Sequence, residues 1–291
     1  MRPPYHCQLP IANCQFNSLS VLRKLAIGNW QLAMVVLVFI GLLLAVTSVL
    51  AQTQQAPTRP TGVLRLRVRV KADDSSPLRG LARKRFFLIP GTLEQNRSLT
   101  DAIERQPLAT RDCYYTKLGA SPALINWLKD GDCESVYCRG VEKDFVTGPK
   151  AVPEFASAFA SSQKEFGSEE TARQWLTTNL TPDLRDGFYR DRQRVLETLL
   201  KQAQTSSGAA VYSVMTDRYG TAFFTDLGPG TYVLSNLIPT ELGQTLATWN
   251  CEVQVKVGDL ATEKPYLVSN RKDRNVKCVA VENPMPVCAT D

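Results

Sequence analysis

The chain offers few residues suited to catalytic chemistry. Its one histidine, His6, precedes a long apolar segment at residues 32–51, so histidine-based triads and imidazole metal sites cannot be built from the residues that follow. Asp130, Asp132 and Glu134 are close enough in sequence to form a carboxylate pair for glycoside cleavage. They follow a predicted helix end, which favours solvated turn acids. We therefore expect no catalytic residue, no cofactor and no metal site.

Six of the eight cysteines follow residue 51 and are disulfide candidates: Cys113, Cys133, Cys138, Cys251, Cys278 and Cys288. An even number of cysteines in an exported chain favours disulfide pairing, because the compartment outside the cytoplasm is oxidising. Three precede residue 208 and three follow it, so complete pairing requires a bridge between the two regions. The best local pair is Cys278–Cys288, which closes a short loop. A zinc site is disfavoured because four residues separate Cys133 from Cys138, whereas the cysteines of a zinc knuckle are usually separated by two.

Four basic side chains alternate with apolar ones in VLRLRVRVK, residues 63–71. This period of two predicts a strand with one buried face. The opposite face then carries Arg65, Arg67, Arg69 and Lys71. Two interpretations stay open: a solvated face that protects an edge strand, or a candidate face for an anionic ligand.

The net charge excludes a strong nucleic-acid footprint. Three of the 34 basic residues and none of the 28 acidic residues precede residue 51, which leaves a net charge of +3 for the rest. Nucleic-acid binding needs a more concentrated basic surface.

Residues 32–51 are apolar and uncharged, about the length that spans a bilayer. Arg23 and Lys24 precede them, so residues 1–31 are expected to stay cytoplasmic. Both a single-pass anchor and a signal peptide cleaved at Ala51 remain open, giving a membrane-anchored or a secreted or periplasmic protein. Residues 52–61 are polar with two prolines and are expected to form a linker.

Residues 93–207 differ in character from their surroundings. Capping residues, first-turn prolines and terminal glycines recur there and predict helices. The predicted starts are Ser121-Pro122, Pro153, Ser168 and Thr181-Pro182, with Gly131, Gly167 and Gly208 at three ends. We therefore expect a helical insertion at 93–207, within a β domain formed by residues 62–92 and 208–291. The strands are predicted at 63–70, 86–89, 209–216, 221–224, 231–237, 249–257, 267–268 and 276–281.

The most specific motif is TDRYGTAFFTDLGPGTYVL, residues 216–234. Asp217 to Gly220 and Pro229-Gly230 favour tight turns, and Leu227 is expected in the core. This pattern resembles the carboxypeptidase regulatory-like domains, a transthyretin-like group that includes Cna-B-type surface domains. The resemblance covers about a third of the chain.

The resemblance implies a transthyretin-like antiparallel β-sandwich, and the helical insertion departs from the family pattern. With the predicted insertion and the apolar segment, the expected fold is α+β: this sandwich with a large helical insertion, preceded by one transmembrane or signal helix. Leu66, Phe223 and Tyr232 should meet in one core. Trp127, Trp175 and Trp249 could serve as sugar-stacking platforms, although core packing is the more frequent role.

The functional expectation is a non-enzymatic extracytoplasmic binding or structural module of the cell envelope, with partner contacts through the helical insertion. The partner class stays open among an envelope protein, a polysaccharide and a lipid surface, with the membrane itself contacted through residues 32–51. The alternative is an exported enzyme with a carboxylate-based site in the insertion or at its junction with the sandwich.

Overall fold

The computed structural model describes residues 61–106, 108–256, 258 and 264–288. The predicted membrane or signal segment at 32–51 lies outside these residues. Within them, no helix is both long enough and apolar enough to cross a membrane.

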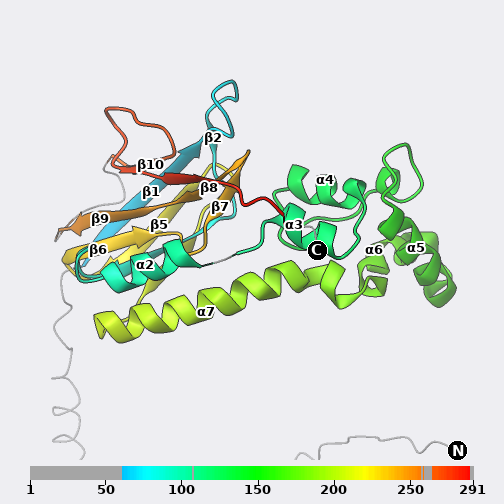
Figure 1. Cartoon of the computed structure of the whole chain (residues 1–291), viewed down its shortest axis with the longest axis horizontal. Helices are drawn as coiled ribbons and strands as arrows, with labels where there is room; N and C mark the ends of the chain where they lie inside the picture. Colours follow the sequence, from blue (N-terminus) through cyan, green and yellow to red (C-terminus); the bar gives the residue numbers. More distant parts are fainter. Residues whose placement is uncertain (1–60, 107, 257, 259–263, 289–291) are drawn as a thin grey trace, which may run out of the picture. The chain divides into compact units, whose positions relative to one another are not determined.

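The β-strands come from both ends of the described chain (Figure 1). Their bounds are β1 Gly62–Val70, β2 Arg79–Gly80, β3 Arg85–Pro90, β4 Tyr212–Met215, β5 Thr221–Leu227, β6 Gly230–Ser235, β7 Thr240–Leu242, β8 Thr245–Thr248, β9 Asn250–Val255, β10 Tyr266–Ser269, β11 Cys278–Val279 and β12 Val281–Pro284.

The helices of the described residues lie between β3 and β4 in the sequence. The α-helices are α2 Arg97–Arg105, α3 Arg111–Lys117, α4 Pro122–Asp130, α5 Pro153–Phe166, α6 Glu169–Trp175 and α7 Phe188–Ser207. Shorter turns are the 3-10 helices η1 Lys143–Phe145 and η2 Leu176–Asn179, and the π-helical turn η3 Asp183–Gly187. The α+β class expected from the sequence is confirmed.

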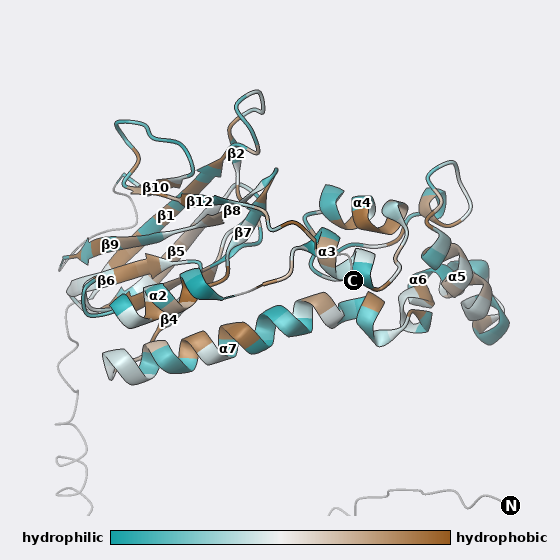
Figure 2. Cartoon of the chain, in the orientation of Figure 1, coloured by the Kyte–Doolittle hydropathy of each residue, from teal (hydrophilic) through white to brown (hydrophobic). Residues whose placement is uncertain are grey.

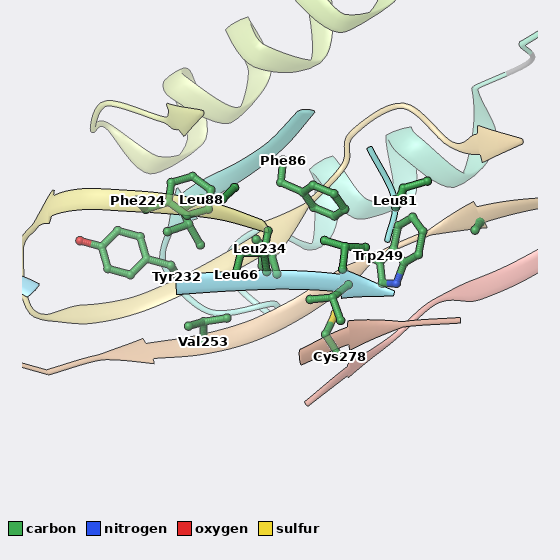
Figure 3. Close-up of a cluster of buried hydrophobic side chains, with 14 of the residues drawn as sticks. Leu66, Leu81, Phe86, Leu88, Phe224, Tyr232, Leu234, Trp249, Val253 and Cys278 are labelled. Carbon is green, nitrogen blue, oxygen red and sulfur yellow. The ribbon is translucent and has the colours of Figure 1, made fainter. Parts of the chain in front are cut away.

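Two sheets pack over one apolar core. The first has the order β11-β10-β1-β2, and β5 also pairs with β1; the second has the order β4-β3-β6-β9. A third sheet, β12-β8-β7, lies beside them. Figure 3 shows Leu66 of the first sheet and Leu234 of the second at the centre of this core, with Trp249 beside them. All three side chains are fully buried. The two separated β segments therefore share one interior, as expected.

The first sheet differs from the expected antiparallel arrangement. β1 pairs in parallel with β10, and β10 in parallel with β11, whereas β2 and β5 are antiparallel to β1. The motif at 216–234 spans β5 and β6, which lie in different sheets, so it carries no information about the strands that reach β1 from the end of the chain.

One residue of the expected core was assigned to the wrong face. Phe224 is buried in the core with Leu66 and Tyr232, whereas Phe223 is 46% exposed. Successive side chains on a strand point to opposite faces, so only one of the two phenylalanines can enter the core. The alternation of β5 buries Ala222 and Phe224 and turns Phe223 outward. A register shift in the pairing with β1 then returns Leu227 to the core.

Helices α2 and α7 cover the outer face of the second sheet. Leu99 and Ile103 of α2 and Leu199 of α7 join Phe87 and Val233 of the sheet in a second apolar cluster. Apolar and polar residues alternate along α7 in the pattern of an amphipathic helix (Figure 2). Part of the insertion is therefore a layer of the β domain.

The remaining helices have a core of their own. It is built around Trp127 of α4, Phe155 of α5 and Tyr115 of α3, with Leu176 from η2. Phe188, at the start of α7, also belongs to it, so α7 contributes to two cores.

The predicted starts of α4, α5 and α6 are confirmed, whereas Thr181-Pro182 leads into the π-helical turn η3 and α7 itself begins at Phe188. Ser121 and Ser168 cap α4 and α6 by accepting backbone N–H bonds, and Pro153 begins α5. Gly167 and Gly208 end α5 and α7 in the left-handed conformation that glycine adopts without strain. Capping is a local interaction, and this explains why these ends could be predicted from the sequence.

Three disulfides join cysteines of the described residues: Cys113–Cys288, Cys133–Cys138 and Cys251–Cys278. Cys113–Cys288 joins α3 to the segment after β12, which confirms the expected bridge between the two regions. The local pair Cys278–Cys288 was wrong. Cys278 lies in β11 and reaches Cys251 of β9 across the sandwich, a proximity that only sheet packing creates. Such pairing indicates an oxidising, extracytoplasmic compartment.

Candidate functional site

The basic row of β1 lies on the outer face of the first sheet. Leu66, Val68 and Val70 are fully buried on the inner face, so the alternating basic residues point outward. In the parallel pairing with β10, Arg67 lies opposite Leu267 and Arg69 opposite Ser269. The predicted alternation is therefore confirmed, and β10 adds a neighbouring surface to it.

A groove of about 500 Å³ follows this outer face. One side is formed by basic side chains of β1, and the other by the loop between β10 and β11. Its lining residues are Arg67, Arg69, Lys71, Leu78, Pro265, Leu267, Val268, Ser269, Arg271, Lys272, Asp273, Asn275 and Val276. Three of the four predicted basic residues thus meet a second basic segment, at 271–272, that sequence reasoning missed.

Most of the positive charge in the groove is uncompensated. Arg67, Arg69, Lys71 and Lys272 form no ion pair with a carboxylate in the described part of the chain. Arg271 is neutralised, because it pairs with Asp74 at 3.2 Å and Glu282 at 2.8 Å. Asp273 is the one acidic residue among the lining residues.

The basic side chains of β1 are only partly engaged by protein oxygens. A guanidinium N–H of Arg69 donates to the carbonyl of Leu78 at 3.0 Å, and Nζ of Lys71 donates to the carbonyl of Asp74 at 3.5 Å. Nε of Arg67 is buried and has no acceptor within the described residues. These groups can still receive anionic oxygens, particularly from carboxylates or phosphates that accept bidentate bonds.

Arg65 stands apart from the other three. It does not line the groove, and its guanidinium lies 5.9 Å from the ring centre of Phe223 on the neighbouring strand. The basic face predicted to bind an anionic ligand is therefore divided. Arg65 packs on an aromatic ring, and the other three basic residues border the groove.

Asn270 holds the end of the groove together. Its amide oxygen accepts from the backbone N–H of Lys71 at 3.0 Å, and its amide nitrogen donates to the carbonyl of Lys71 and to Glu282, both at 2.8 Å. Because Glu282 also holds Arg271, the basic residues on the two sides belong to one hydrogen-bonded frame.

A tight turn follows β1 at this end. The carboxylate of Asp73 accepts hydrogen bonds from Ser75 and Ser76. The bond from the Ser75 side chain, then that from Ser76, lowers the pKa of Asp73 to about 2. The turn therefore keeps its charged acceptor across ordinary pH.

The acids proposed for glycoside cleavage lie elsewhere, at the junction between the sandwich and the helices. Nζ of Lys84 is 3.3 Å from Asp132 and 3.6 Å from Glu134, and Arg192 is 3.7 Å from Glu134. Asp130 is exposed and takes no part. The expectation of solvated turn acids was wrong for Asp132 and Glu134. Tertiary packing brings three cations to that turn: Lys84 just before β3, Arg111 of α3 and Arg192 of α7.

Glu134 is held ionised. Desolvation raises its pKa, but Lys84, Arg192 and Arg111 together lower it by more, so the pKa lies below the ordinary value of a glutamate. A small pocket of about 160 Å³, lined by Lys84, Arg192 and Glu134 among others, opens beside it. An ionised, ion-paired carboxylate does not donate the proton that glycoside cleavage requires. This arrangement acts as a structural connection.

The lowered pKa of Glu134 predicts a pH-dependent stability. A carboxyl group with a depressed folded-state pKa contributes stability above its unfolded pKa and loses it as pH falls through the folded value. We expect Glu134→Gln to lower the free energy of unfolding by about 1–3 kcal/mol at pH 7. The difference from the unsubstituted chain should shrink steadily below pH ~4.5. Urea unfolding across this range measures it.

Glu197→Gln is the matched control, since Glu197 is exposed on α7 and forms no ion pair with another described residue. It should change stability by less than about 0.5 kcal/mol at every pH. A stability difference for Glu134→Gln that stayed constant down to pH 3 would contradict the assignment.

The three tryptophans proposed as sugar-stacking platforms differ in burial. Trp127 and Trp249 are buried in the helical and sandwich cores. Trp175, on α6, is 49% exposed. Core packing is therefore the role of the first two, and only Trp175 presents a ring surface to solvent.

The helical part has a cavity of about 650 Å³ between the 136–142 loop and α6. Tyr137, Arg139 and Arg173 are among its lining residues. Arg139 is fixed by stacking 4.2 Å from the ring centre of Trp127 and by donating to its carbonyl at 2.6 Å. A rigid arginine beside the exposed Tyr137 is typical of protein contact surfaces.

Comparisons with known proteins found no matching family model, no matching curated protein and no matching solved structure. The resemblance seen in residues 216–234 therefore rests on this chain's own motif. Within the described residues, no group of three or more histidine, cysteine or acidic side chains is arranged to hold a metal ion.

Proposed function

We propose that this chain is a non-enzymatic extracytoplasmic binding module that holds an anionic ligand in the groove between β1 and the β10–β11 loop. The observation that carries the proposal is a set of four basic side chains around one groove, Arg67, Arg69, Lys71 and Lys272, which form no ion pair with any carboxylate that the structure describes. Uncompensated charges on a surface repel one another, and an anionic ligand removes that repulsion.

The proposed location follows from two features. The disulfides indicate an oxidising compartment, and the apolar segment at 32–51 supplies export or anchoring at the cell envelope. The proposed fold is a transthyretin-like sandwich of the carboxypeptidase regulatory-like type. It is supported by the turn at Asp217 to Gly220 and by burial of Leu227 and Tyr232.

A second contact surface is proposed on the helical insertion, for a protein partner of the envelope. The cavity beside Arg139, with the exposed Tyr137 and Trp175 nearby in the insertion, supports this role. Tyrosine, tryptophan and arginine are the residues that contribute most binding energy at protein interfaces.

The anion-binding proposal is tested by titrating the purified full-length chain with polyuronate, inorganic phosphate and vesicles containing an anionic lipid. The double variant Arg67→Gln/Arg69→Gln should weaken binding of the best probe by at least about tenfold. Binding should also weaken as ionic strength rises, because the groove is open to solvent.

The control is Arg105→Gln/Arg194→Gln, which removes the same charge from helices outside the groove. It should keep at least half of the original affinity. The proposal fails if no anionic probe binds, or if both double variants lose affinity equally.

A further inference from the structure

We propose that the occupant of this groove is a linear anionic polymer, specifically an acidic polysaccharide chain lying along the strands. This inference rests on the proposed function and specifies its ligand. It follows from three features of the groove: the spacing of its cations, its depth, and the chemistry of its floor.

The cations are arranged in a line. Arg67 and Arg69 occupy alternate positions of β1, and Lys71 continues the same alternation just after the strand ends at Val70. Side chains at alternate positions of an extended strand recur about every 6.7 Å. The row therefore extends over about 13 Å. A single small anion is held best by side chains that converge on it, whereas this row offers successive contacts to a chain of anionic groups.

The row borders a recess. β10 is the parallel neighbour of β1, and its outward residues Leu267 and Ser269 lie beside the row. Lys272 and Asn275, in the loop that follows, form the opposite side and are exposed. A planar membrane would meet the rim formed by that loop, but a chain can enter the recess and reach the floor.

The floor combines apolar and hydrogen-bonding groups. Pro265, Leu267 and Val276 are half-buried apolar residues, and the polar Ser269 also lines this part of the groove. A sugar ring has C–H surfaces that pack on apolar side chains, hydroxyls that accept and donate hydrogen bonds, and, in acidic polysaccharides, a carboxylate or phosphate for arginine.

Two other chain-like ligands fit less well. The residues lining the groove include no aromatic ring, and single-stranded nucleic acid relies on aromatic stacking. An extended peptide binds a sheet by adding to an open edge. Here β10 is hydrogen-bonded on both sides, to β1 and β11, so the floor of the groove has no open edge.

The test is a length series of uronic acid oligomers, from monomer through dimer and tetramer to octamer, titrated into the full-length chain. The dissociation constant should fall by at least about 30-fold from monomer to tetramer, expressed per chain, and change much less from tetramer to octamer. The Arg67→Gln variant should lower the slope of log affinity against log salt by about one, as expected for loss of one cation that contacts a polyanion.

The control Arg105→Gln/Arg194→Gln should leave both the length dependence and the salt slope unchanged. Equal affinity for monomer and octamer would overturn the polymer inference while leaving anion binding intact. Tighter binding to anionic vesicles, or to a single-stranded oligonucleotide of matched charge, would also overturn it. The absence of binding to every anionic probe would instead refute the proposed function itself.

Discussion

Replacing Phe224 with alanine is expected to destabilise the fold by about 3–5 kcal/mol, whereas the same change at the adjacent Phe223 should cost less than about 1 kcal/mol. Phe224 is 2% exposed and packs between the two sheets, with Leu66 and Tyr232 in the same core. Removing its ring leaves a cavity that rigid strands cannot close. Phe223 is largely exposed, so replacing it with alanine removes a ring that packs under the Arg65 guanidinium but leaves no cavity in the core.

Urea unfolding followed by tryptophan fluorescence measures this contrast, because Trp249 lies in the same core as Phe224. The two variants differ by one position and carry the same substitution, so composition and unfolded-state effects are matched. Equal losses at the two positions, or a larger loss at Phe223, would show that β5 presents the opposite face to the core.

Arg111→Met is expected to lower the free energy of unfolding by about 3–5 kcal/mol, because it breaks a buried ion pair and leaves its partner charged. The guanidinium of Arg111, 5% exposed, lies 3.5 Å from Glu241 of β7 and donates to the carbonyl of Leu128 at 3.0 Å. Glu241, 9% exposed, also accepts from the backbone N–H of Arg111. The pair fastens the helical core to the sandwich.

The matched control is Arg194→Met on α7, where the exposed arginine pairs with Asp191. Its loss should cost less than about 1 kcal/mol, as for other solvated ion pairs. In the background of Arg111→Met, the further change Glu241→Gln should recover part of the lost stability, because it removes the orphaned charge. If the second substitution instead added its own full cost, the two residues would not be coupled through this pair.

Much of the secondary structure could be predicted from the sequence because its signals are local. A serine cap and a following proline specify the start of α4, and Gly208 specifies the end of α7. The alternation in β1 specifies which of its side chains are buried. Each of these signals acts within a few residues, so no knowledge of distant strands is needed.

The candidate site could be predicted only in part. Arg67, Arg69 and Lys71 were recognised because their alternation is visible in one strand. Lys272 was missed, since it belongs to a charged loop with no pattern of its own, and only the parallel pairing of β10 with β1 brings it to the same groove. A run of basic residues after a short β-like segment was the one available signal.

The amino-acid sequence by itself determined the helix ends, the two faces of β1, and the requirement for a disulfide between the two regions. The tertiary structure alone decided that Phe224 enters the core in place of Phe223, that Cys278 bonds to Cys251, and that Glu134 is ion-paired. The physical reason is the distance along the chain over which each kind of interaction acts. Periodicity and capping act between neighbours along the chain, whereas sheet register and side-chain pairing depend on which distant segments pack together.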